Sequence, residues 1–185
     1  MKDLNDLKIY LLDWKQSMVN KWLLAFKAED NVEVVCDDFV CFMEAHPEVD
    51  CIVSPANSFG KMSGGYDAAI SRFLGWDFMD NVQKYIQEHY YGEQPVGSSF
   101  IIDTPKDNIR LIHTPTMRIP EKIKDDKIIY QCMRTTLICA LENDVNCIVI
   151  PAFGGACGGV SEEIISIMMK RAYDQIKTRK SVSRL

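Results

Sequence analysis

The chain has 185 residues, of which 47% are hydrophobic and 25% are charged. These values are ordinary for a globular protein, and the length suffices for one domain with a substantial core. The net charge of -5 and an isoelectric point near 5.2 argue against a surface built to bind nucleic acid. No apolar run is long enough to span a membrane, and the acidic residues 1–6 predict no secretory signal.

Short apolar runs alternate along the chain with longer segments whose apolar residues recur at helical spacing. The strands are predicted at residues 8–12, 32–35, 50–54, 98–103, 110–113 and 147–150. The helices are predicted at residues 17–28, 39–45, 67–74, 78–90, 126–142 and 162–176. This alternation indicates an α/β fold, a three-layer α/β/α sandwich with a mixed, mainly parallel central sheet. We expect a single domain over residues 1–185, with a core from about 8 to 176 and a basic flexible tail over 177–185.

A glycine-bearing loop follows the predicted strand 50–54. It contains Asn57 and the paired glycines Gly64 and Gly65, and it ends at Asp67, where a helix is predicted to start. A strand–loop–helix step leaves free backbone N–H groups at the helix start, where an anion such as a diphosphate can bind. The paired glycines remove Cβ atoms that would block close approach of the backbone. We therefore predict a phosphate site flanked by Asn57 and Asp67.

A second loop of the same kind follows the predicted strand 147–150. It holds four glycines within six residues, namely Gly154, Gly155, Gly158 and Gly159. Ligands of parallel sheets bind outside the carboxyl ends of the strands, and both loops lie at such ends. The two loops therefore predict the two sides of one phosphate clamp.

These loops resemble those of the macro domain family, whose members bind ADP-ribose. Asn57 and Asp67 stand ten residues apart, which is the spacing found in the family's ADP-ribosyl hydrolases. The second loop resembles the family's Pro-Ala-(apolar)-Gly-Thr-Gly-x-x-Gly, with Gly155 and Ala156 in the Thr-Gly positions. The similarity extends over about residues 32–176 and is closest to bacterial or phage-associated members of the family.

The resemblance implies a ligand as well as a fold. Asp38 matches the family's aspartate that contacts the adenine amino group, and the backbone N–H of Phe39 would contact a ring nitrogen. Asn57 would hold the distal ribose and Asp67 would orient or activate a water, so these two are the implied catalytic residues. The implied ligand-binding residues are Asp38, Phe39, Gly64, Gly65, Tyr66, Ala152, Phe153, Gly154, Gly155, Ala156, Cys157, Gly158 and Gly159. The implied partner is ADP-ribose or an ADP-ribosylated substrate, and we expect no cofactor, metal, membrane or nucleic acid.

Two departures from the family pattern leave the activity open. Ser54 replaces the first Asn of the usual Asn-Ala-Ala-Asn, and Cys157-Gly158-Gly159 stands where an aromatic residue is often found. The resemblance to hydrolases implies mono-ADP-ribosyl hydrolysis or the processing of ADP-ribose-1″-phosphate. One alternative is a reader that binds ADP-ribose, or a related nucleotide made from NAD, without turnover. A third is a structural or phage-associated protein that keeps only the fold.

Several of these residues also have plain structural roles open to them. Asn57 can hydrogen-bond its own loop, and Asp67 can serve as a helix N-cap. The aromatic residues beside the loops, Phe59, Tyr66 and Phe153, either belong to the core or cover a ribose or a base.

His113 lies in an apolar strand, where we expect a buried core histidine rather than an acid or base. The seven cysteines form no CxxC pair and no zinc spacing, which indicates reduced, mostly buried thiols in a cytosolic protein. Cys157 is the exception because it falls inside the second loop. We expect a cytoplasmic location; the tripeptide Ser183-Arg184-Leu185 resembles a peroxisomal address, but such tripeptides occur by chance.

Overall fold

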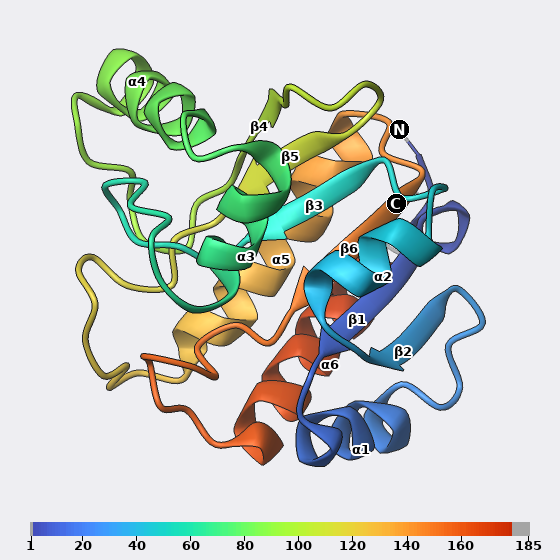
Figure 1. The fold of residues 1–185 in the computed structure, drawn as a ribbon. Coiled ribbons are helices and arrows are strands. Elements are labelled where there is room, and N and C mark those ends of the chain that lie inside the picture. The colour runs from blue at the N-terminus through green and yellow to red at the C-terminus, as the bar shows by residue number, and fades with distance from the viewer. Residues whose placement is uncertain (1, 179–185) are drawn as a thin grey trace, which may run out of the picture.

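A six-stranded sheet runs through the centre of the computed structural model, which describes residues 2–178, and helices cover both of its faces (Figure 1). The strands are β1 (Lys8–Asp13), β2 (Val32–Cys36), β3 (Cys51–Ser54), β4 (Phe100–Asp103), β5 (Arg110–His113) and β6 (Cys147–Pro151). Their order across the sheet is β2-β1-β6-β3-β5-β4. Every neighbouring pair is parallel except β4 and β5. The prediction of a mixed, mainly parallel sheet is confirmed.

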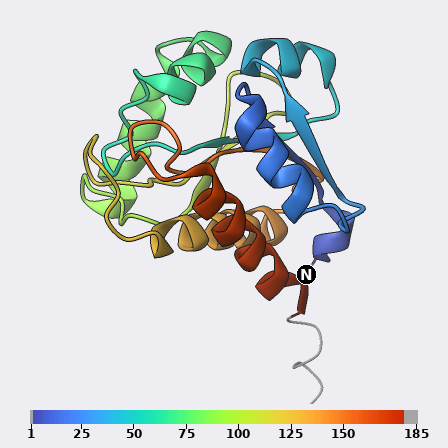
Figure 2. The ribbon, with the colours of Figure 1, turned by 90° about the horizontal axis from the view of Figure 1, so that it is seen from below.

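The helices form one layer on each side of this sheet (Figure 2). They are α1 (Gln16–Ala25), α2 (Phe39–Ala45), α3 (Gly65–Leu74), α4 (Phe78–Tyr90), α5 (Lys127–Glu142) and α6 (Glu162–Thr178), preceded by the short 3-10 helix η1 (Leu4–Asp6). One layer contains α1, α5 and α6, and the other contains α2, α3 and α4. No helix within residues 2–178 is long and apolar enough to cross a membrane.

Alternation along the strands divides the core into two parts. In β1, Ile9 and Leu11 pack with the α1, α5 and α6 layer, whereas Tyr10 and Leu12 pack with the α2, α3 and α4 layer. Successive strand side chains point to opposite faces, so a strand buried on both faces is apolar throughout. This is why the apolar runs in the sequence located the strands.

The core begins earlier in the chain than residue 8. Leu4 and Leu7 are buried in the layer formed by α1, α5 and α6. The side chain of Asp3 accepts a hydrogen bond from the backbone N–H of Asn5 at 3.0 Å and so caps η1. The expected start of the core is therefore corrected from Lys8 to Leu4.

The last helix also extends beyond its predicted end. α6 continues through Lys177 to Thr178, and the ammonium of Lys177 lies 2.6 Å from the carboxylate of Glu29. These two residues therefore belong to the folded domain and not to a tail. The remainder of the predicted tail, residues 179–185, lies outside the described residues, and so does the tripeptide that resembles a peroxisomal address.

Candidate functional site

Two adjoining cavities open at the carboxyl ends of the central strands. The first cavity has a volume of about 390 Å³ and lies beside the ends of β1, β2 and β6. The second cavity has a volume of about 430 Å³ and lies beside the end of β3 and the two glycine loops. The residues that line both are Gly65, Tyr66, Ala152 and Ala156. The cavities are therefore two ends of one cleft, joined where α3 begins beside the second glycine loop.

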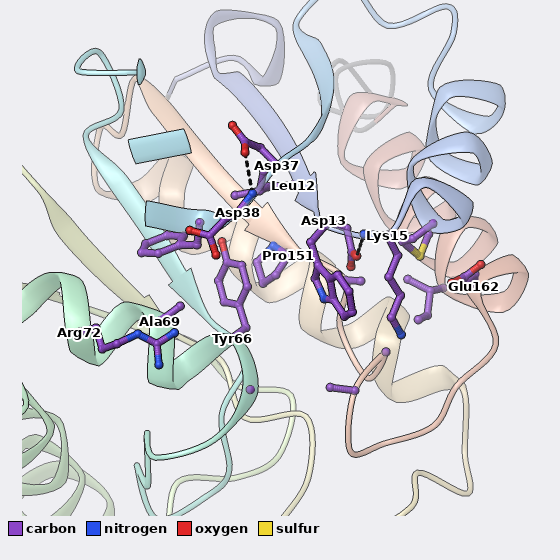
Figure 3. A pocket seen from close by; sticks show the side chains of 18 residues that line it. Leu12, Asp13, Lys15, Asp37, Asp38, Tyr66, Ala69, Arg72, Pro151 and Glu162 are labelled. Carbon is purple, nitrogen blue, oxygen red and sulfur yellow. Dashed lines mark hydrogen bonds between the residues drawn. The ribbon is translucent and has the colours of Figure 1, made fainter. Parts of the chain in front are cut away.

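The first cavity presents a hydrogen-bond acceptor next to a donor. Asp38 is the N-cap of α2, and its Oδ1 accepts a hydrogen bond from the backbone N–H of Val40 at 2.8 Å. Its other oxygen, Oδ2, and the backbone N–H of Phe39 bond to no protein group within residues 2–178. Figure 3 shows Tyr66 reaching from α3 toward Asp38. Asp38 thus caps α2 through Oδ1 and also lines the cavity, where Oδ2 has no protein partner among the described residues.

Among the residues of the first cavity that the prediction omits, three are consecutive and lie at the end of β1. Asp13 is the last residue of β1, Trp14 and Lys15 follow it, and all three line the cavity. The backbone N–H of Lys15 donates to Oδ1 of Asp13 at 2.8 Å, and burial raises the pKa of Asp13 above its ordinary value. They were predictable in principle, because ligands of parallel sheets bind outside the carboxyl ends of the strands and these residues lie at such an end.

Asn57 lines the second cavity while its side chain holds its own loop together. Its Nδ2 donates to the carbonyl of Lys61 at 3.0 Å. Its Oδ1 accepts from the backbone N–H groups of Phe59 at 3.1 Å and Lys61 at 3.3 Å. The structure thus supports the loop-bonding role of Asn57. Only the second hydrogen of Nδ2 is left for a ligand.

Asp67 lines the second cavity from the first turn of α3. The N-cap of this helix is Gly64, so the alternative that Asp67 is the cap is wrong. Its Oδ1 accepts a hydrogen bond from the hydroxyl of Ser54 at 2.6 Å, and the side chain is only 7% exposed. Burial raises the pKa of Asp67 to about 7, although the Ser54 hydrogen bond acts in the opposite direction. Asp67 therefore exchanges its proton near neutral pH.

The glycines of the two loops are required for different reasons. Gly154 has φ +76, and a Cβ there would come within 2.7 Å of Ile129. A Cβ on Gly158 would lie 2.8 Å from the carbonyl of Gly154. Glycine at these two positions is therefore required by the packing and conformation of the loop itself. In contrast, Gly64 has an ordinary extended conformation with φ −136, and its Cβ would meet nothing within 4 Å. The fold does not require glycine at position 64. The lack of a side chain there instead leaves room for a ligand in the second cavity.

Free backbone donors occur on both segments that meet at the junction of the two cavities, the second glycine loop and the start of α3. The N–H groups of Ala156, Cys157 and Gly158 bond to no protein group within residues 2–178. The first-turn N–H groups of α3, at residues 65–67, are likewise free. Successive free amides and a helix N-terminus together make a favourable seat for an anion. The chemistry predicted from the glycines, a diphosphate held by backbone donors, is compatible with this geometry.

Two of the predicted ligand-binding residues line neither cavity. The side chain of Phe153 is fully buried in the core beneath α5 and α6, so its ring does not cover a ribose. Gly159 has φ +64 and donates to the carbonyl of Ala156 at 3.2 Å, which makes it a turn residue. Phe59 also lies outside both cavities, and the guanidinium of Arg118 sits 5.1 Å from its ring centre. The remaining predicted residues line at least one cavity.

His113 is buried in the core, as expected. Its Nδ1 lies 2.6 Å from Oε1 of Gln94, and its ring stacks on Phe100. Burial lowers the pKa of His113 to about 3, so the imidazole is neutral at physiological pH. In the described part of the chain, no group of three His, Cys, Asp or Glu residues is arranged to hold a metal ion.

The sequence profile of the family described as Macro domain matches residues 53–169, which is more than half of the chain. The chain belongs to the macro domain family. The resemblance inferred from the glycine loops is thereby confirmed. A protein of Aquifex aeolicus (strain VF5), described only as uncharacterized, is 30% identical over 123 residues, which are 66% of this chain and 71% of that protein.

Solved macrodomain structures share this macro domain's fold at low sequence identity. The macrodomain of Mycobacterium tuberculosis DarG has a TM-score of 0.59 at 19% identity, over 70% of this chain and 84% of that one. A mutant Oceanobacillus iheyensis macrodomain with ADPR has a TM-score of 0.63 at 15% identity, over 96% of this chain and 82% of that one. The Trypanosoma brucei macrodomain in complex with ADP has a TM-score of 0.56 at 19% identity, over 69% of this chain and 51% of that one. At these identities the likeness establishes the fold alone.

The buried carboxyl of Asp67 predicts a pH-dependent stability. Its pKa is about 7 in the folded protein against 3.8 ordinarily, so between these values the folded state keeps a proton that the unfolded state releases. As the pH rises from about 4 to about 7, the free energy of unfolding of the wild type should therefore fall, relative to that of Asp67→Asn, by about 1.4 kcal/mol for each pH unit. Urea denaturation of both proteins at several pH values from 3.5 to 8 measures this. Parallel curves for the two proteins would show that Asp67 titrates normally.

Proposed function

We propose that this macro domain binds ADP-ribose and hydrolyses the linkage between ADP-ribose and an attached group. The observation that carries the proposal is Asp67, a buried carboxyl with a pKa of about 7 in a cavity that adjoins a row of free backbone N–H groups. A macrodomain of Oceanobacillus iheyensis is described with ADPR and one of Trypanosoma brucei with ADP, which favours the same ligand class here.

The chemistry of each part of the cleft suggests how the ligand lies. The first cavity, where Asp38 offers an acceptor and Phe39 a donor, suits the adenine end. The free amides at the junction, including that of Ala156, suit the diphosphate. The second cavity then takes the distal ribose, with its anomeric carbon near Asp67 and Asn57. Backbone N–H dipoles hold the anion at short range and so offset the repulsion from the acidic chain.

Asp67 is suited to act as a general base. Its Oδ1 is occupied by the Ser54 hydroxyl, so Oδ2 is the oxygen available to take a proton. In the proposed reaction a water donates that proton to Oδ2 and attacks the anomeric carbon, while the bond to the attached group breaks and its electrons leave with that group. Glycosidic bonds break through a transition state with oxocarbenium character, and a nearby carboxylate stabilises its positive charge. Ser54 positions the base by holding the other oxygen.

A binding-only role is the second candidate, and one observation favours it. The amide of Asn57 is largely used by its own loop, so Lys61 and Ser63 are the main polar side chains besides Asp67 that the second cavity offers to orient a ribose. A protein of this kind would read or sequester ADP-ribose, or a related nucleotide made from NAD, without turnover.

Turnover separates the two candidates. Asp67→Asn keeps the shape and the acceptor for Ser54 but removes the base, so we expect ADP-ribose binding to persist and hydrolysis to fall by at least about a hundredfold. The wild-type rate should rise with pH through about 7, where Asp67 loses its proton. Release of ADP-ribose from a mono-ADP-ribosylated protein, followed at several pH values, measures both. Binding without release by the wild type would establish the reader.

Gly64 tests the binding mode without disturbing the fold. Its conformation is open to any residue and no atom lies near its Cβ position, so Gly64→Val should fold normally and lower the melting temperature only slightly, because valine is a poorer helix N-cap than glycine. The new side chain would enter the second cavity and weaken ADP-ribose binding by roughly a hundredfold, with a smaller loss for Gly64→Ala. Isothermal titration of the three proteins checks this. Equal affinities would show that the ligand does not pass over Gly64.

Cys157 reports occupancy of the cleft. Its thiol is exposed and lines the second cavity, whereas Cys41 on α2 is exposed and lines neither cavity. Saturating ADP-ribose should slow alkylation of Cys157 by iodoacetamide several-fold and leave Cys41 unaffected, because only the former would be covered. Mass spectrometry of timed samples quantifies both thiols. Equal protection of both, or of neither, would argue against ligand in the second cavity.

A further inference from the structure

Trp14 stands at the rim of the first cavity with its indole largely in solvent. The side chain lines the cavity and is 74% exposed. Tryptophan usually gains its stabilising energy by burial of a large apolar surface, so an indole left exposed contributes little to the fold. Among the described residues, its only ring contact is with the ammonium of Lys15, 5.7 Å from the ring centre.

The backbone around Trp14 is nonetheless held in place. Oδ1 of Asp13 accepts a hydrogen bond from the N–H of Lys15 at 2.8 Å, which closes the turn between β1 and α1. The carbonyl of Trp14 accepts from the thiol of Cys36, 3.6 Å away at the end of β2. A fixed turn therefore presents an exposed aromatic ring beside a cavity.

The other walls of the first cavity complement a flat heterocycle. Figure 3 shows Asp13 and Lys15 on one side of the cavity, Tyr66 on the other and Pro151 between them. Asp38 contributes a free carboxylate oxygen at the edge of this space. A planar ring that enters here would have its polar edge near Asp38. One of its faces would be open toward the turn that carries Trp14.

We propose that Trp14 is the stacking platform for the nucleobase, so that the indole covers the base once the nucleotide has entered the first cavity. This inference rests on the proposed binding of ADP-ribose and deepens it. Stacking on an aromatic ring is tolerant of base identity, because every base has a π-face. Trp14 therefore supplies affinity for the nucleoside end, while the choice among bases falls to the edge contacts at Asp38 and Phe39.

The chain offers a matched control in Trp76. Its indole is 50% exposed, and it lines neither cavity. Of the three tryptophans, the remaining one, Trp22, is fully buried in the core. Both rings can therefore be replaced without opening the core. Trp14→Ala should keep a melting temperature near that of the wild type, and Trp76→Ala should lower it modestly, because half of that indole is buried.

The experiment is isothermal titration of ADP-ribose into the wild type, Trp14→Ala, Trp14→Phe and Trp76→Ala, with tryptophan fluorescence recorded in parallel. Trp14→Ala should weaken binding by about fivefold to a hundredfold, which is the range that base–aromatic stacking provides. Trp14→Phe should recover most of the affinity because it keeps an aromatic face. ADP-ribose should quench the fluorescence of the wild type and of Trp76→Ala, and the quenching should disappear in Trp14→Ala.

The outcomes separate this inference from the proposed function. Wild-type affinity in Trp14→Ala, with the quenching retained, would overturn the stacking role and leave ADP-ribose binding intact. Equal losses in Trp14→Ala and Trp76→Ala would also overturn it, because the effect would then not be specific to the cavity. A wild type that binds no ADP-ribose would overturn the proposed function and the stacking role together.

Discussion

The parallel pairing of β6 between β1 and β3 is the constraint on which the whole site depends. Leu12 pairs with Pro151, and Ile52 pairs with Val149, so the three strands end at the same edge of the sheet. A shift of one residue in either pairing would turn the strand's side chains to the opposite face and separate the loops that follow. Because the register is fixed by two apolar layers, loops distant in sequence form one cleft. The core thus positions the site without contributing its chemistry.

Electrostatics explains why the cleft is built mainly from backbone. The chain carries a net charge of -5, and the first cavity is lined by four carboxylates against two cations, namely Asp13, Asp37, Asp38 and Glu162 against Lys15 and Arg72. An anion in such surroundings gains little from the overall field of the protein. Free N–H groups at Ala156, Cys157 and Gly158 provide local positive potential without adding charge. The acidic side chains and the anion site are compatible, because the N–H groups act on the anion at hydrogen-bond distance whereas the net charge of the chain acts over a longer range.

Most of the fold was predictable from the sequence, whereas the site was predictable only in part. All twelve main elements occur where apolar periodicity predicts them, because strands buried on both faces and amphipathic helices leave distinct patterns. The second glycine loop was predictable because four glycines in six residues are unusual at a strand end, and the first because a glycine pair lies between Asn57 and Asp67. The direction of single side chains was not predictable. Phe153 turns into the core and Trp14 stays in solvent, and both outcomes depend on loop conformation rather than on residue type. The hydrogen bond between Ser54 and Asp67 was equally hidden, since thirteen residues separate the partners.

The contrast between the glycines has a consequence for how such a chain can change over evolution. Replacing Gly154 or Gly158 strains the loop whether or not anything binds there. Replacing Gly64 costs the fold little, since its backbone is ordinary and its surroundings are open. Homologues that have lost ligand binding could therefore vary at position 64 while they retain the glycines of the second loop. Variation at position 64 among relatives would therefore indicate relaxed selection on the cleft rather than on the fold.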